Sequence, residues 1–264
     1  MGTMEVFTKD HFIGLQQGKI FVREWSPIAD SLNSAIILIH DSLGCVDLWR
    51  DFPSKLCNKT DRRVFAYDRL GFGRSGGRFD KLSVNFIAEE SEACLATIID
   101  KFQLKSFIIY GHSVGGAMAV VCAGRFGELC KAVITESAQA FIEDVTLQGI
   151  IDAQKEFQNE RQIDRLRKYH GAKAEWVLHA WTDTWLSPEF ASWSLIDDLP
   201  KVTCPVMVIH GERDEFGSLR HPDMIADLAG GASEKYIIPN CGHIPHRDKP
   251  NKVLELVTNF VERL

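Results

Sequence analysis

The feature that most constrains this chain is residues 105–127, with the sequence KSFIIYGHSVGGAMAVVCAGRFG. An apolar run rich in β-favouring residues leads into the turn at 111–116, and an apolar, alanine-rich segment follows. The turn reads G-x-S-x-G, with Gly111, Ser113 and Gly115 in the fixed places. A serine on so sharp a turn has backbone very close to it, so only small residues fit two positions on either side. The stretch therefore predicts a strand, a tight turn that exposes Ser113, and a helix whose N–H groups point at the serine.

The rest of the chain alternates between short apolar runs and segments with apolar residues at helical spacing. This alternation predicts an α/β fold, with a mostly parallel sheet covered by helices on both faces. A hairpin is expected first, with strands near 12–15 and 19–25. Further strands are expected at 34–40, 63–67, 106–110, 131–135, 205–210 and 235–239, and helices at 47–59, 85–102, 117–125, 221–228 and 251–264. In such sheets the chemistry sits where strands end, so the loops after the strands are the ones to examine.

Residues 138–195 interrupt the alternation. They are rich in charged and aromatic side chains, including Trp176, Trp181, Trp185 and Trp193, and contain no clear strand. We expect three or four helices here, as an insertion into a single domain. Its core would be formed by residues 1–137 and 196–264.

Composition narrows the function classes. The 264 residues suffice for one large domain, and a net charge of −6 without a basic cluster argues against nucleic acid and an anionic membrane surface. The chain has no apolar run of about eighteen residues, and its N-terminus lacks the layout of a signal peptide. The seven cysteines are scattered without a C-x-x-C pair. They fit reduced thiols and a cytoplasmic location.

Two loops after predicted strands carry the partners that a serine nucleophile needs. A serine hydroxyl is a weak nucleophile, so it requires a general base within hydrogen-bond reach and a carboxylate that orients the base. Asp214 follows the strand at 205–210, and His243 follows the strand at 235–239. The order Ser113, Asp214, His243 is the one expected when a G-x-S-x-G turn carries the nucleophile.

With these residues the chain resembles an α/β-hydrolase fold enzyme over nearly its whole length. The resemblance rests on HDSLG at 40–44, DRLGFGRS at 68–75, GHSVGG at 111–116, GERD at 211–214 and GH at 242–243. It implies an eight-stranded sheet with a helical cap formed by 138–195. It also implies that Ser113 is the nucleophile, that His243 is the base and then the acid, and that Asp214 orients His243. The oxyanion hole would use the backbone N–H groups of Ser42 and Val114.

One residue departs from the family pattern. Many relatives have glycine where this chain has Asp41. A carboxylate that pointed inward beside an oxyanion would be unfavourable. We therefore expect Asp41 to point away as a turn residue.

Other residues compete for the same roles. Glu215 adjoins Asp214, and Glu136 follows the strand at 131–135, so both are alternative acids. His246, three residues after His243, is the alternative base. The loop at 68–76 lacks the G-K-[ST] ending of a phosphate loop and is expected to pack beneath the site. The nine histidines form neither H-x-x-x-H nor H-E-x-x-H, so no metal or cofactor is expected.

Serine, histidine and aspartate in this arrangement suit acyl transfer to water. We predict hydrolysis of a small-molecule carboxylic ester, thioester, lactone or amide through an acyl-enzyme. The alternatives are a carbon–carbon bond hydrolase of the meta-cleavage type, and a cofactor-free oxygenase or ligand receptor on the same fold. Candidate pocket residues are His112, Trp181 and Trp185. Their alternative roles are loop hydrogen bonding for His112 and attachment of the helical segment to the core for the tryptophans.

Overall fold

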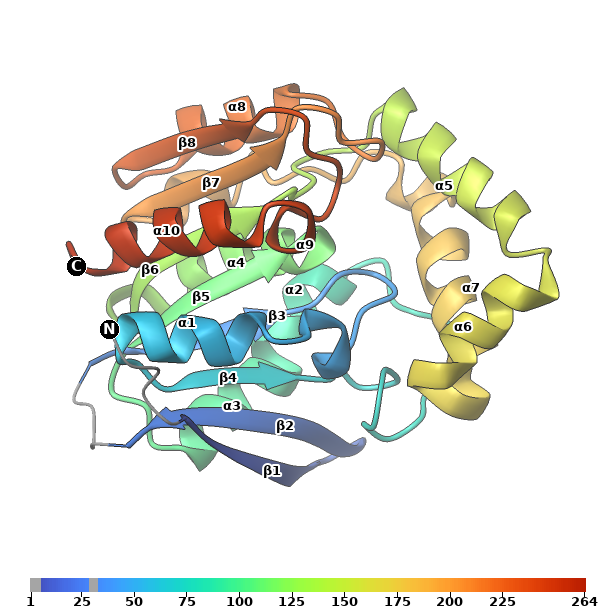
Figure 1. The fold of residues 1–264 in the computed structure, drawn as a ribbon. Helices are drawn as coiled ribbons and strands as arrows, with labels where there is room; N and C mark the ends of the chain where they lie inside the picture. The colour runs from blue at the N-terminus through green and yellow to red at the C-terminus, as the bar shows by residue number, and fades with distance from the viewer. Residues whose placement is uncertain (1–5, 29–32) are drawn as a thin grey trace.

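The computed structural model describes residues 6–28 and 33–264 (Figure 1). In this part of the chain eight strands form one sheet, in the order β1-β2-β4-β3-β5-β6-β7-β8. Strands β3 to β8 pair in parallel, whereas β2 is antiparallel to both β1 and β4. The mostly parallel eight-stranded sheet is therefore confirmed. The strands are β1 Val6–Leu15, β2 Gly18–Pro27, β3 Ala35–Ile39, β4 Val64–Tyr67, β5 Phe107–His112, β6 Cys130–Glu136, β7 Val206–Gly211 and β8 Ser233–Ile238.

The two antiparallel strands at the N-terminal edge are longer than the sequence suggested. They pair from Leu15 opposite Gly18 to Val6 opposite Pro27. The first half of β1 is largely exposed and contains the polar run Thr8, Lys9 and Asp10, so it lacks the apolar pattern of a buried strand. It is stabilised instead by cross-strand ion pairs such as Arg23 Nε to Asp10 Oδ1 at 2.6 Å.

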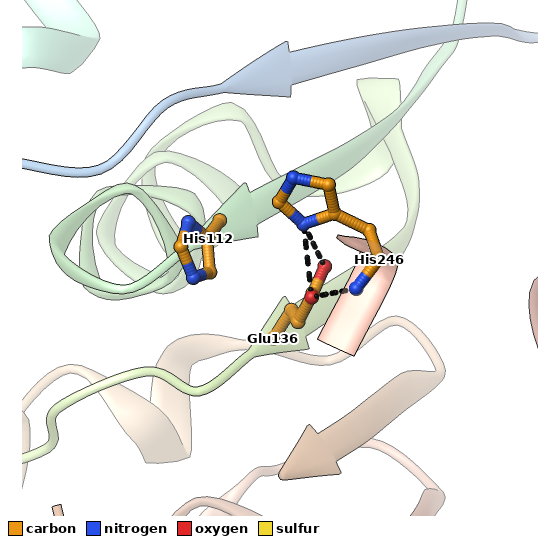
Figure 2. A group of neighbouring side chains, drawn as sticks. All are labelled: His112, Glu136 and His246. Carbon is orange, nitrogen blue, oxygen red and sulfur yellow. Dashed lines mark hydrogen bonds and ion pairs between the residues drawn. The ribbon is translucent and has the colours of Figure 1, made fainter. Parts of the chain in front are cut away.

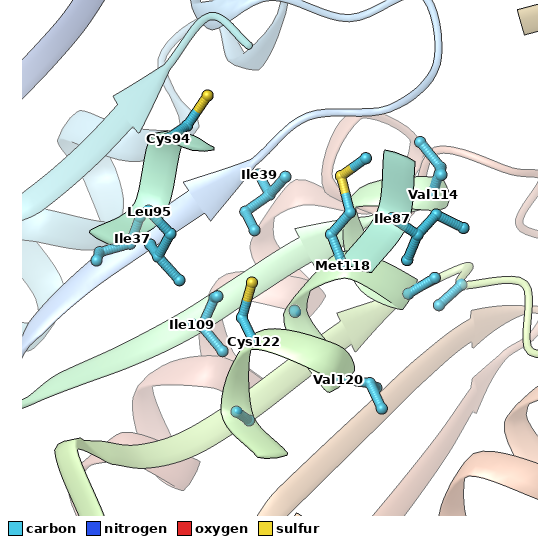
Figure 3. Close-up of a cluster of buried hydrophobic side chains, with 14 of the residues drawn as sticks. Ile37, Ile39, Ile87, Cys94, Leu95, Ile109, Val114, Met118, Val120 and Cys122 are labelled. Atoms are coloured by element: carbon cyan, nitrogen blue, oxygen red, sulfur yellow. The ribbon is translucent and has the colours of Figure 1, made fainter. Parts of the chain in front are cut away.

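Helices cover both faces of the sheet, and alternate residues of each strand face opposite layers. Ile37 and Ile39 of β3 pack toward α4 Val114–Phe126, whereas Ile36 and Leu38 pack toward α1 Phe52–Thr60 and α10 Pro250–Val261. Figure 3 shows part of the first layer, where Cys122 of α4 lies beside Ile109 of β5, and Met118 of α4 belongs to the same cluster. That layer also contains α2 Phe86–Glu90, α3 Ala96–Lys101 and α8 Arg220–Leu228. Both faces of the central strands are thus buried, as their continuous apolar runs predict.

Two predicted helices differ in detail. The helix expected at 47–59 is a 3-10 turn, Val46–Trp49, followed by α1. Arg50 between them has φ 54°, which no α-helix accommodates, and Pro53 stands in the first turn of α1, where its missing N–H costs nothing. The helix expected at 85–102 is present, but a π-helical segment, Ser91–Leu95, separates α2 from α3.

The segment expected to be helical consists mainly of α5 Asp144–Glu156, α6 Glu160–His170 and α7 Ala174–Trp185. These helices lie beyond the carboxyl ends of the parallel strands (Figure 1). Lys173 Nζ donates to the carbonyl oxygens of Phe72 at 3.2 Å and Gly73 at 2.8 Å. His170 accepts a hydrogen bond at Nδ1 from the Gly73 N–H at 2.9 Å. The glycine-rich loop at 68–76 therefore attaches α6 and α7 to the rest of the molecule.

None of the helices in residues 6–28 and 33–264 combines the length and the apolar surface needed to span a bilayer.

Candidate active site

Ser113 occupies the turn between β5 and α4 in a conformation that L-residues rarely adopt. Its φ is 56° and its ψ is −126°, a strain of about 1–3 kcal/mol. The turn is held by hydrogen bonds from Ser113 N to Glu136 O and from Gly116 N to Ser113 O, both 2.8 Å. A Cβ on Gly111 would lie 2.0 Å from the carbonyl oxygen of Gly115. A Cβ on Gly115 would lie 2.3 Å from that of Ile39, so both glycines are sterically required.

Gly111→Ala is therefore expected to destabilise the fold by about 3 kcal/mol or more, because backbone must move to admit the methyl group. The measurement is the free energy of unfolding from urea titrations. Gly14→Ala is the matched control, since nothing lies within 4 Å of a Cβ at that position in β1. Equal stability of the two variants would contradict the packing argument.

The structure brings Ser113, His243 and Asp214 together from three strand-end loops. His243 Nε2 lies 3.0 Å from Ser113 Oγ, and His243 Nδ1 lies 2.8 and 2.9 Å from the two carboxylate oxygens of Asp214. We call this arrangement the Ser–His–Asp chain. An imidazole that donates from Nδ1 to a carboxylate presents Nε2 as an acceptor, so it can take the serine proton.

Asp214 is fixed by its surroundings. Its side chain is fully buried, and Oδ1 accepts a hydrogen bond of 2.8 Å from the Phe216 N–H. Burial alone would raise the pKa of Asp214, but the charge and the hydrogen bond of His243 outweigh it and lower the pKa. The carboxylate is therefore ionised at neutral pH and aimed at the imidazole.

The alternative acids and base lie elsewhere. Glu136 Oε1 accepts hydrogen bonds from the backbone N–H of His246 at 2.6 Å and from its Nδ1 at 3.0 Å (Figure 2). The Tyr110 hydroxyl donates to the other oxygen of Glu136. The Glu215 side chain contacts the backbone of His243, because Glu215 Oε2 accepts a hydrogen bond of 3.3 Å from His243 N. Among these carboxylates, Asp214 is the one whose oxygens bond the His243 ring.

His112, Glu136 and His246 also form a group with metal-ligand chemistry. Their candidate ligand atoms lie within 4.8 Å of one another (Figure 2). Nδ1 of His112 lies 3.3 Å from Asp41 Oδ2, and Nε2 lies 2.8 Å from the backbone oxygen of His243. His246 uses Nδ1 for Glu136. Hydrogen bonds thus account for most of the donor atoms in this group.

The two N–H groups expected to form an oxyanion hole are available. Within residues 6–28 and 33–264, neither Ser42 N nor Val114 N donates a hydrogen bond to the protein. Val114 is the first residue of α4, where a helix leaves N–H groups without intrahelical acceptors.

Asp41 is a turn residue, as expected, because its Oδ1 accepts a hydrogen bond of 2.8 Å from Leu43 N. It does not point away from the site, however, because it lines the same cavity as Ser113 and His243. Its other oxygen faces His112 Nδ1. Burial alone would lower the pKa of His112, but the hydrogen bond to Asp41 and the charges of Glu136 and Asp41 raise it to about 9. Burial alone would raise the pKa of Asp41, yet His112 holds it below its ordinary value. The pair is therefore ionised at neutral pH, and its charges offset each other.

This ion pair predicts a pH dependence of stability. Because the folded-state pKa of His112 is about 9 against an ordinary 6.5, its stabilisation is complete below pH 6.5 and is lost as the pH rises through 9. The free energy of unfolding should fall over this range by up to roughly 3 kcal/mol. Urea titrations at a series of pH values measure it. In Asp41→Asn the decline should be smaller. An unchanged decline would show that the pH dependence does not arise from the Asp41–His112 pair.

A cavity of about 230 Å³ adjoins Ser113 and His243. The expected pocket residues His112, Trp181 and Trp185 all line it. Seven of the fifteen lining residues are apolar, and the surface of the wall is mostly apolar. The full set is Asp41, Ser42, Leu43, Leu48, His112, Ser113, Gln139, Thr146, Ile150, Trp181, Trp185, Phe216, His243, Ile244 and Arg247.

Gln139 and Arg247 are two polar lining residues that the sequence analysis missed. Gln139 is buried, and its Oε1 lies 3.3 Å from Ser113 Oγ. It follows the carboxyl end of β6, so its place in a strand-end loop was a usable signal. Arg247 comes four residues after His243, and no sequence pattern predicts that a charged residue at this position lines the cavity.

Comparison with models of known protein families shows which family the chain belongs to. The family model described as alpha/beta hydrolase fold matches residues 34–197, more than half of the chain. The chain belongs to the alpha/beta hydrolase fold family.

Curated relatives of this hydrolase-fold chain are distant. It is similar to the human serine hydrolase BPHL, with 25% identity over 86% of this chain and 79% of the relative. It is 24% identical to the 2-hydroxy-6-oxo-6-(2'-aminophenyl)hexa-2,4-dienoic acid hydrolase of Metapseudomonas resinovorans, over 76% of this chain and 74% of the relative. The probable lysophospholipase BODYGUARD 3 of Arabidopsis thaliana is 31% identical over 43% of this chain, but the match spans 23% of that protein.

Solved structures support the same fold. A serine hydrolase involved in carbazole degradation superposes with a TM-score of 0.75, 18% identity and coverage of 98% of this chain and 100% of the other. The carboxylesterase CesB of Bacillus subtilis superposes with a TM-score of 0.71, 18% identity and coverage of 98% and 93%. At these identities the likeness concerns the fold alone.

Proposed function

We propose that this protein is a serine hydrolase that cleaves a carboxylic ester of a small molecule through an acyl-enzyme. The observation that carries the proposal is the Ser–His–Asp chain, with 3.0 Å from His243 Nε2 to Ser113 Oγ and 2.8 Å from His243 Nδ1 to Asp214 Oδ1. These are the contacts that a base-activated serine needs. Membership of the alpha/beta hydrolase fold family, whose relatives include proteins named hydrolases, adds support.

In the proposed first half-reaction, Ser113 Oγ attacks the ester carbonyl carbon while His243 Nε2 takes the hydroxyl proton. The carbonyl electron pair moves to oxygen, and the N–H groups of Ser42 and Val114 stabilise the oxyanion. The tetrahedral intermediate then collapses, the carbon–oxygen bond to the alcohol breaks, and Nε2–H protonates the leaving oxygen. Asp214 stabilises the imidazolium between these steps.

In the second half-reaction a water molecule replaces the alcohol. His243 Nε2 takes a proton from the water as its oxygen attacks the acyl carbon, and then returns the proton to Ser113 Oγ as the acid leaves. The Asp41–His112 pair favours this chemistry, because the positive imidazolium offsets a carboxylate that would otherwise repel the oxyanion.

The helical segment 138–195 is proposed as a cap on a core formed by 1–137 and 196–264. It contributes Ile150, Trp181 and Trp185 to the cavity wall. A cavity of about 230 Å³ with mostly apolar walls suits a short-to-medium acyl or aromatic ester. A carbon–carbon bond hydrolase remains the second candidate, on the strength of the dienoic acid hydrolase relative that aligns over 76% of this chain.

The test is a panel of p-nitrophenyl esters from acetate to decanoate, with a meta-cleavage-type diketone as an additional substrate. Ester turnover with an optimum at short or medium chain length is expected. Turnover of the diketone alone would replace the ester proposal with the second candidate. No turnover of any substrate by folded protein would reject both.

A further inference from the structure

We propose that the substrate of this site carries a carboxylate, and that Arg247 binds it inside the active-site cavity. The inference rests on the proposed function, because Arg247 lines the same cavity as Ser113. It adds a substrate class, a small ester with one negative charge, to the proposed reaction.

Among the described residues that line the cavity, Arg247 is the charged side chain that no other side chain pairs. Four lining residues carry or can carry a charge: Asp41, His112, His243 and Arg247. Asp41 is paired with His112 at 3.3 Å, and His243 is paired with Asp214 at 2.8 Å. In the part of the chain that the structure describes, Arg247 forms no ion pair, and its side chain makes one hydrogen bond, from Nη2 to Leu48 O at 3.1 Å. The guanidinium of Arg247 therefore carries a positive charge without a paired carboxylate.

The guanidinium is also incompletely satisfied as a donor. Nε of Arg247 is buried and has no hydrogen-bond partner, and Nη1 has none among the described residues. A buried donor without an acceptor costs about 1–3 kcal/mol, and more when it is charged. An anionic ligand beside this arginine would supply the missing acceptors.

The backbone holds this arginine in place before any ligand binds. It belongs to the short helix α9 Pro245–Asp248, and its N–H donates to Ile244 O at 3.0 Å. The preceding residue, His246, is fixed by Glu136 through its backbone N–H at 2.6 Å and its ring at 3.0 Å. Little conformational entropy is lost when such a preorganised group binds an anion.

The chemistry of the wall selects the kind of anion. A guanidinium fork matches the two oxygens of a carboxylate better than it matches a point charge. Leu43, Leu48 and Ile244 also line the cavity, so the body of the ligand must be apolar. A half-ester of an aliphatic dicarboxylic acid, or an ester of a hydroxy acid, has this combination of groups.

The test compares two ligands of the same shape. Mono-methyl adipate carries a carboxylate at neutral pH, and methyl adipamate carries a neutral carboxamide in its place. Isothermal titration calorimetry on Ser113→Ala measures binding of each without turnover. We expect the monoanion to bind about tenfold or more tightly than the amide. Adding Arg247→Met should abolish this preference, and adding Arg247→Lys should keep part of it. Adding Arg161→Met, which removes an exposed charge from α6, should leave it unchanged.

Equal affinities for the two ligands, no detectable binding of the monoanion, or a preference that survives Arg247→Met would overturn the inference. Hydrolysis of both compounds by the wild-type protein separates this result from the proposed function. Anion preference in binding without any ester hydrolysis would support the carboxylate site and reject the proposed reaction. Serine-dependent hydrolysis of neutral esters without anion preference would do the reverse.

Discussion

Ser113→Ala is expected to lower kcat for ester hydrolysis by about 10⁴-fold or more. The hydroxyl oxygen is the atom that forms the acyl bond in the proposed reaction. Gln139, whose Oε1 lies 3.3 Å from Ser113 Oγ, offers no nucleophile in its place. Intact-mass spectrometry after treatment with an aryl fluorophosphonate provides a second readout. The wild type should gain one adduct on Ser113, and the variant should gain none.

The backbone of Ser113 supplies a control for misfolding. Glycine tolerates φ 56° far better than serine does, so Ser113→Gly should be at least as stable as the wild type. It should also be as inactive as Ser113→Ala. Thermal unfolding and hydrolysis assays on the same preparations measure both. A variant that kept a tenth of the wild-type rate would place the nucleophile at another residue and remove the basis of the proposal.

Much of this site could be predicted from sequence because parallel strands align their carboxyl ends. Ser113, Asp214 and His243 each follow a strand that reads as a continuous apolar run, so their convergence follows from the sheet. Gly111 and Gly115 are required because backbone atoms come too close to admit a Cβ, and the G-x-S-x-G spacing reveals this requirement in the sequence. The strands β3 and β5 could be predicted equally well, because strands buried on both faces appear in the sequence as continuous apolar runs.

What the sequence could not predict depends on distances between side chains from different loops. Nothing in the pattern around Asp41 indicates that its carboxylate would meet His112, because the pairing requires the turn after β3 to lie against the end of β5. The break at Arg50 depends on a positive φ that no sequence rule assigns to arginine. Arg247 belongs to the same class, since its position relative to the cavity follows from how Glu136 holds His246.

The identity of the acid is decided by a matched pair of variants. Asp214→Asn should lower kcat by about 10⁴-fold, because an amide cannot stabilise the imidazolium and favours the wrong tautomer of His243. Glu136→Gln leaves the Ser–His–Asp chain intact, so its effect on kcat should stay below about tenfold. It should instead lower the free energy of unfolding by about 2 kcal/mol, since the buried Glu136 loses its charged contacts with His246 and His112.

Glu215→Gln serves as the control beside Asp214. Its oxygen contacts the backbone N–H of His243 rather than the ring, and a glutamine oxygen can accept the same hydrogen bond. We therefore expect a rate close to that of the wild type. Steady-state kinetics and urea titrations on the three variants separate the roles, because catalytic loss and stability loss should fall on different residues. If Glu136→Gln were as inactive as Asp214→Asn while remaining folded, the charge on Glu136 would be part of the catalytic machinery, acting through His246 and His112 on the loop that carries His243.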